Sequence, residues 1–106
     1  MPKQVIRTDK AGPPLGAYSQ GFRAGGFIFV TGCGPIDPAT GNVSGETVEE
    51  QTEVAINNIE AILQAAVAGL GDAVKATVHL KDTAHFPRFN TVYARRFPEP
   101  RPARTT

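Results

Sequence analysis

Apolar side chains recur at three- and four-residue steps from Val48 to Ala68, which is the spacing of one face of an α-helix. Thr47 precedes this stretch and Glu50 follows three residues later, so together they predict a capping box at the helix start. Gly69 and Gly71 predict its end. The stripe consists of Val48, Gln51, Thr52, Ala55, Ile59, Ile62, Leu63, Ala66 and Leu70.

A second helix is predicted from His85 to Arg96, with Pro87 in the first turn, where proline is tolerated. Its stripe consists of Phe86, Phe89, Asn90, Tyr93 and Phe97. Tyr93 and Phe97 are expected to pack this helix on a sheet. Asn90 is the polar member of the stripe, so it needs a hydrogen-bond partner.

Strands are predicted over residues 74–80, 4–7, 18–24 and 27–31, and a tight turn at Gly25-Gly26 joins the last two. In the first of these segments Val74, Ala76, Val78 and Leu80 alternate with polar residues, which indicates one buried face. The last ten residues contain three prolines and have the composition of an extended tail. The element order predicts an α+β domain, residues 1–106, with two helices on one face of a sheet.

The composition limits the class of protein. A chain of 106 residues buries a modest core, so further burial would come from a partner or from self-association. Cys33 is the only cysteine, which excludes an intramolecular disulfide and a cysteine-rich zinc site. The sequence has no run long enough to span a bilayer and no apolar signal-peptide segment at its start. These features predict a soluble, cytoplasmic protein without a membrane partner.

Charge is uneven along the chain. Residues 1–80 carry five Lys/Arg and eight Asp/Glu, a balance of −3, whereas residues 81–106 carry six and two, a balance of +4. The basic end suits anions from a carboxylate to RNA. An RNA surface is disfavoured, because the balance is small and the nearby aromatic residues belong to the apolar stripe.

Other candidate chemistry is weak. Gly32-Cys33-Gly34 lacks the third glycine and the following helix of a dinucleotide site. Cys33 has no histidine near it in sequence, so a buried thiol is favoured over a nucleophile. His79 and His85 do not have metal-ligand spacing on one element, so no metal site is predicted.

Three separated segments, in order, resemble the Rid family, the reactive intermediate deaminases also called YjgF. They are Gly16-Ala17-Tyr18-Ser19-Gln20, the stretch from Phe29 to Gly41 containing Pro35-Ile36-Asp37-Pro38, and Phe89-Asn90-Thr91-Val92-Tyr93 with Arg101-Pro102-Ala103-Arg104-Thr105-Thr106. The resemblance implies a chorismate-mutase-like mixed β-sheet with two helices on one face, in a homotrimer with ligand pockets between subunits. The implied activity, without cofactor, is hydrolysis of 2-imino acids, the tautomers of reactive enamines, to 2-keto acids and ammonia. The alternatives are a trimeric keto-acid-binding regulator and an RNA-acting protein.

The resemblance also implies roles for residues. Arg104 matches the arginine that holds the substrate carboxylate, a task suited to its planar guanidinium fork. Substrate-binding positions are matched by Tyr18, Thr31, Gly32, Cys33, Asn90 and Thr106. Two features depart from the family pattern. Cys33 and Gly34 replace a glutamine and an apolar residue. Relatives also continue for about another 20 residues, in a strand after the arginine and a final strand that brings a glutamate to the pocket.

Overall fold

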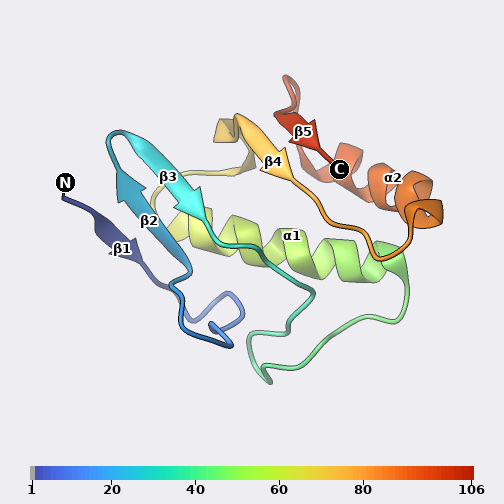
Figure 1. The fold of residues 1–106 in the computed structure, drawn as a ribbon, viewed down its shortest axis with the longest axis horizontal. Coiled ribbons are helices and arrows are strands. Elements are labelled where there is room, and N and C mark those ends of the chain that lie inside the picture. Colours follow the sequence, from blue (N-terminus) through green and yellow to red (C-terminus); the bar gives the residue numbers. More distant parts are fainter. Residues whose placement is uncertain (1) are drawn as a thin grey trace.

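The computed structural model describes residues 2–106, so Met1, the first residue of the predicted domain, lies outside the described residues. The elements follow in the order β1 (Gln4–Ile6), β2 (Gly21–Ala24), β3 (Phe27–Val30), α1 (Val48–Ala65), η1 (Leu70–Asp72), β4 (Lys75–Thr77), η2 (Thr83–His85), α2 (Phe86–Arg96) and β5 (Ala103–Thr105). Figure 1 shows α1 running past both groups of strands, with α2 beside it. The predicted α+β class with two helices is confirmed.

The strands form two sheets where one mixed sheet was expected. Strands β1, β2 and β3 pair antiparallel in that order, and β4 pairs parallel with β5. Within the described residues β3 and β4 are not hydrogen-bonded to each other. Strand β5 pairs with β4 alone, and no strand in residues 2–106 connects the three-stranded sheet to the two-stranded one.

The core lies between the helices and the inner faces of the two sheets. Its larger cluster consists of Ile56, Leu63, Leu70, Phe89, Val92, Tyr93 and Phe97, with Ile28 and Val30 of β3 and Ala76 of β4 packed against it. A smaller cluster of Ile6, Ala11, Ile62 and Ala66 joins β1 to α1. Tyr93 and Phe97 are therefore buried as predicted. Neither described α-helix is both long and apolar enough to cross a bilayer.

Strand ends differ from the sequence prediction. Strand β4 is shorter than residues 74–80, and Val74, expected to face inward, is 73% exposed. Tyr18 lies in the loop before β2, because pairing with β1 begins only at Gly21. The predicted tail folds back as β5, since Ala103 N–H donates to Val74 O and Val78 N–H donates to Thr105 O.

Helix α1 begins as predicted and ends early. Thr47 Oγ1 accepts a hydrogen bond from Glu50 N–H at 3.1 Å, which confirms the cap. The helix ends at Ala65, before either predicted glycine, and Val67 N–H and Ala68 N–H donate to the carbonyls of Gln64 and Leu63. This bonding is a Schellman motif, which places Val67 at φ +60°.

Val67→Gly is expected to stabilise the protein by about 1 kcal/mol. A β-branched residue in the left-handed region is strained, while glycine adopts it freely. Val67 is 95% exposed, so its removal loses little packing. Urea unfolding would measure the gain, and Val67→Ala, which keeps a Cβ, should recover less of it. A destabilised glycine variant would show that the valine is not strained.

Candidate active site

Arg104 lies at the centre of β5 and its side chain rests on α2. Its guanidinium carbon is 4.6 Å from the ring centre of Tyr93 and 5.3 and 5.6 Å from those of Phe86 and Phe89. Arg104 Nη1 donates to Asn90 Oδ1 at 2.9 Å. The polar position on the stripe of α2 therefore has a partner, and that partner is the arginine.

This arrangement is suited to holding a carboxylate. The aromatic rings and Asn90 fix the plane of the guanidinium, and within residues 2–106 Asn90 provides its one side-chain hydrogen bond. The other N–H groups are available as a bidentate fork for an anion. Arg101 has a different environment, since its guanidinium donates to Glu99 Oε1 and to the carbonyl of Ala94.

The aromatic platform under Arg104 was not predicted as part of a site. The helical spacing of Phe86, Phe89 and Tyr93 is typical of a core stripe and predicts only packing. Burial raises the pKa of Tyr93, and the opposing positive charge of Arg104 is the smaller effect, so the phenol stays neutral near pH 7. Helical spacing alone could not show that these rings contact the guanidinium of Arg104, because Arg104 comes from β5, a strand distant in sequence.

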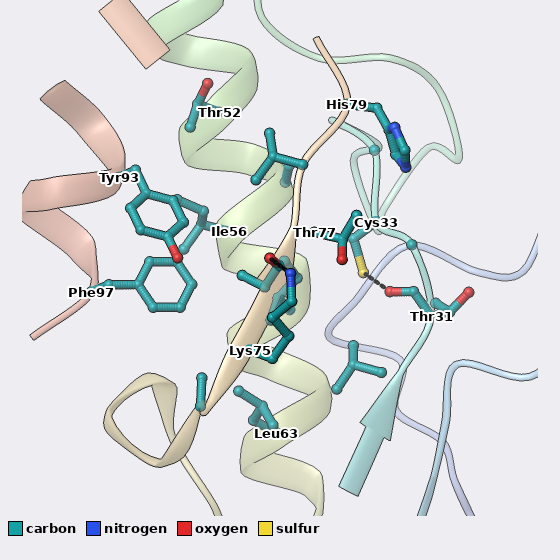
Figure 2. A pocket seen from close by; sticks show the side chains of 18 of the residues that line it. Thr31, Cys33, Thr52, Ile56, Leu63, Lys75, Thr77, His79, Tyr93 and Phe97 are labelled. Carbon is teal, nitrogen blue, oxygen red and sulfur yellow. Dashed lines mark hydrogen bonds between the residues drawn. The ribbon is translucent and has the colours of Figure 1, made fainter. Parts of the chain in front are cut away.

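A second cluster follows β3. Thr31, Gly32 and Cys33 line a shallow depression together with Tyr18, whose hydroxyl accepts a hydrogen bond from Leu15 N–H at 3.0 Å. Cys33 Sγ donates to the carbonyl of Thr31 at 3.5 Å (Figure 2). Four of the residues singled out in the sequence are thus brought together, over a separation of more than a dozen residues.

Cys33 is not activated as a nucleophile. Burial raises the pKa of its thiol to about 11, so almost none of it is thiolate at neutral pH. The prediction of a buried or half-buried thiol is confirmed, since Cys33 is partly buried.

The rate of Cys33 alkylation should therefore rise with pH beyond the range in which a free cysteine levels off. At pH 8, iodoacetamide should modify the native thiol about a hundredfold more slowly than the thiol of the urea-unfolded chain. This follows from a pKa of about 11 in the folded chain against 9.0 for an unperturbed cysteine. The rates can be followed by mass spectrometry. Equal rates in the two states would mean that the thiol is neither buried nor protonated.

A groove with a cavity volume of about 1450 Å³ lies between β3 and β4. We call it the β3–β4 groove; Thr31 and Cys33 stand at the end of β3 on one side, and Lys75, Thr77 and His79 come from the opposite side (Figure 2). The helix α1 contributes Thr52, Ala55 and Ile59. His85 also lines it, but no group of three His, Cys, Asp or Glu suited to a metal is found in residues 2–106.

The two clusters remain separate in one chain. Neither the groove nor the shallow depression includes Arg104 or Asn90. Thr106 is exposed just after β5.

The basic C-terminal region is largely ion-paired. Arg96 donates to Glu53 at 3.0 Å and to Glu60 at 3.3 Å, and Arg95 lies 3.6 Å from Glu53. Arg88 pairs with Glu49 at 2.7 Å. These pairs join α2 to α1 and reduce the positive surface that an RNA backbone would need.

Comparison with known proteins gives matches over nearly the whole chain. The family model described as "Endoribonuclease L-PSP" matches residues 8–106. A RutC family protein of Pyrococcus abyssi is 51% identical over 104 residues, covering 98% of this chain and 82% of the relative. The chloroplastic Reactive Intermediate Deaminase A of Arabidopsis thaliana is 42% identical, over 98% of this chain and 56% of its own length.

Solved structures have the same fold. E. coli TdcF, crystallised with bound serine, superposes with a TM-score of 0.89 at 33% identity, and the match covers 96% of this chain and 82% of that chain.

Proposed function

This chain belongs to the Endoribonuclease L-PSP family, the Rid or YjgF family, and we propose that it hydrolyses 2-imino acids to 2-keto acids and ammonia. The Arabidopsis relative in this family is named a reactive intermediate deaminase. The chemistry of the site around Arg104 supports an imino acid as the substrate.

The observation that carries the proposal is the position of Arg104. An isolated surface arginine would have no fixed plane, whereas this one is held by Asn90 and three aromatic rings. A small 2-imino acid offers a planar carboxylate that matches such a fork. The serine bound to TdcF is likewise a small molecule with a carboxylate.

The proposed reaction needs little covalent chemistry from the protein. Arg104 holds the substrate carboxylate, and water adds to the imine carbon to give a tetrahedral amino alcohol. This intermediate expels ammonia as the carbon–oxygen double bond forms, so atoms and charge balance without a redox step. Orientation of the substrate and water supplies much of the rate gain.

We also propose that the active form is a homotrimer. On the outer face of the three-stranded sheet, Phe27 and Phe29 are 62% and 60% exposed and Val5 extends the same apolar surface. Association through this face would cover it and would allow the Tyr18–Thr31 cluster of one copy to approach Arg104 of another. Sedimentation at micromolar concentration should give about three times 11.3 kDa, and a monomer would contradict the shared pocket.

Arg104→Lys is expected to weaken 2-keto-acid binding or imine turnover at least about tenfold, roughly 1.4 kcal/mol. Lysine keeps the charge and loses the planar fork, so the change tests geometry. Calorimetry with 2-ketobutyrate and ammonia release from an enzymatically generated imine would measure the two effects.

Arg101→Lys is the matched control and should change little. Equal effects at the two arginines, with the oligomer intact, would contradict the assignment of Arg104. Binding without turnover would favour the regulatory alternative. Salt-sensitive RNA retention that depends on Arg95 and Arg96 would favour an RNA-acting protein.

A further inference from the structure

Gln20 is a buried glutamine at the end of the loop that joins β1 to β2, and its side-chain amide is fully hydrogen-bonded. Its exposed fraction is 3%. Gln20 Nε2 donates to the carbonyls of Thr8 and Gly12, both at 3.0 Å, and Gln20 Oε1 accepts from Thr8 N–H at 2.8 Å. A buried amide with both donors and its oxygen bonded is held in one orientation. Gln20 therefore closes the neck of this loop.

Both ends of the loop are fixed, whereas its tip is exposed. Gly12 N–H donates to Asn58 Oδ1 at 3.0 Å, so both backbone polar groups of Gly12 are bonded to buried side chains. Thr31 N–H donates to the carbonyl of Gln20 at 2.9 Å, which ties the loop to the end of β3. Tyr18 lies on the tip and is 48% exposed. The position of Tyr18 relative to Thr31 thus depends on the bonds that Gln20 makes.

The hydroxyl of Tyr18 is arranged as a hydrogen-bond donor. It accepts a hydrogen bond from Leu15 N–H at 3.0 Å, and Tyr18 N–H donates to the carbonyl of Gly16 at 2.9 Å, so the tip is bonded to itself. A hydroxyl has one proton and two lone pairs, so the bond from Leu15 leaves the proton for another acceptor. The carboxylate of a 2-imino or 2-keto acid is such an acceptor.

We propose that Gln20 is a positioning residue for substrate binding, which holds the loop tip so that the Tyr18 hydroxyl donates to the bound 2-imino or 2-keto acid. Gln20 lies beneath the shallow depression that Tyr18 and Thr31 line, and it acts through Tyr18. A tip that is not held would have to be ordered on binding, which lowers affinity. This inference rests on the proposed function, because it assigns the ligand to the Tyr18 hydroxyl.

Gln20→Glu tests the role with little change in side-chain size. At pH 8 a carboxylate would face the carbonyls of Thr8 and Gly12, so the dissociation constant of 2-ketobutyrate should rise at least about tenfold. Burial should raise the pKa of the introduced carboxyl, and its neutral form donates one O–H and still accepts from Thr8 N–H. The affinity, relative to the unaltered protein at the same pH, should therefore recover to within about threefold at pH 5. Gln64→Glu, the same change at an exposed position of α1, should alter binding less than about twofold at either pH.

A double-mutant cycle distinguishes positioning of Tyr18 from a general structural effect. In the Tyr18→Phe background, Gln20→Glu should weaken binding by less than about a further twofold at pH 8, because the hydroxyl that Gln20 positions is absent. A full tenfold loss in that background, or a loss in Gln20→Glu that is the same at pH 5 and pH 8, would overturn the proposal.

A measurement without ligand separates this inference from the proposed function. The chain has two tyrosines, Tyr18 and Tyr93, so carbon-13 labelling of tyrosine rings gives two sets of NMR signals, which Tyr18→Phe assigns. As pH rises from 5 to 8, the Tyr18 signals of Gln20→Glu should move to those of a mobile, solvated ring, before any change at Tyr93. If 2-ketobutyrate binds neither protein but the Tyr18 signals move, the proposed function fails and the positioning of Tyr18 is supported. Unchanged Tyr18 signals, or a change simultaneous with that of Tyr93, would overturn the role of Gln20.

Discussion

Phe97→Ala is expected to lower the free energy of unfolding by about 3–5 kcal/mol, the range for removing a fully buried phenylalanine. The side chain is 4% exposed and stacks on Tyr93, with ring centres 4.3 Å apart and planes 21° apart. Phe97 caps the C-terminal end of α2, where its N–H donates to Tyr93 O, so the ring is anchored at the point where the chain leaves the helix. Urea unfolding followed by circular dichroism would measure the loss.

The control for this prediction is Val74→Ala. Val74 is also apolar, but it is 73% exposed, so its truncation should cost less than about 0.5 kcal/mol. A loss below about 1 kcal/mol for Phe97→Ala would mean that the ring is not part of the core and that α2 is wrongly oriented.

Local patterns predicted the helices well because their signals lie within a few residues of each other. The cap at Thr47 and the buried positions Ile62, Leu63 and Ala66 follow from helical spacing alone. The end of α1 was missed because Val67 occupies a conformation that a valine rarely adopts. The sequence holds two glycines shortly afterwards, and these are the more favourable stop signals.

The long-range features could not be read from local patterns. The proline-rich end becomes a strand only because β4 offers it a partner, and this pairing also places Arg104 over α2. The family resemblance singled out Arg104 and Asn90, and the structure places them 2.9 Å apart.

Asn58 is the residue whose importance neither pattern nor spacing indicated. It is 3% exposed on α1, and its side-chain nitrogen donates to the carbonyls of Gly34 and Ile36 at 3.2 and 2.8 Å. Its oxygen accepts from Gly12 N–H at 3.0 Å. Asn58 thus connects α1 to two loops, the one that contains Gly12 and the one that contains Gly34 and Ile36. These loops lie on either side of the cluster formed by Tyr18 and Thr31.

Asn58→Asp is expected to destabilise the fold by more than about 3 kcal/mol at pH 8, because a carboxylate would face two carbonyl oxygens in a buried site. Burial should raise the pKa of the introduced carboxyl above its value in the unfolded chain. The Asn58→Asp variant should therefore be most stable below about pH 4, the pKa of the carboxyl in the unfolded chain. Its stability should fall as pH rises through the higher pKa of the carboxyl in the folded chain. The difference in the free energy of unfolding between the variant and the unaltered protein, measured by urea unfolding at several pH values, removes the background pH effect. Asn57→Asp makes the same chemical change at an exposed neighbour and should cost less than about 0.5 kcal/mol. Similar losses at the two positions, or a loss at Asn58 that does not change with pH, would contradict this account of how the loops are held.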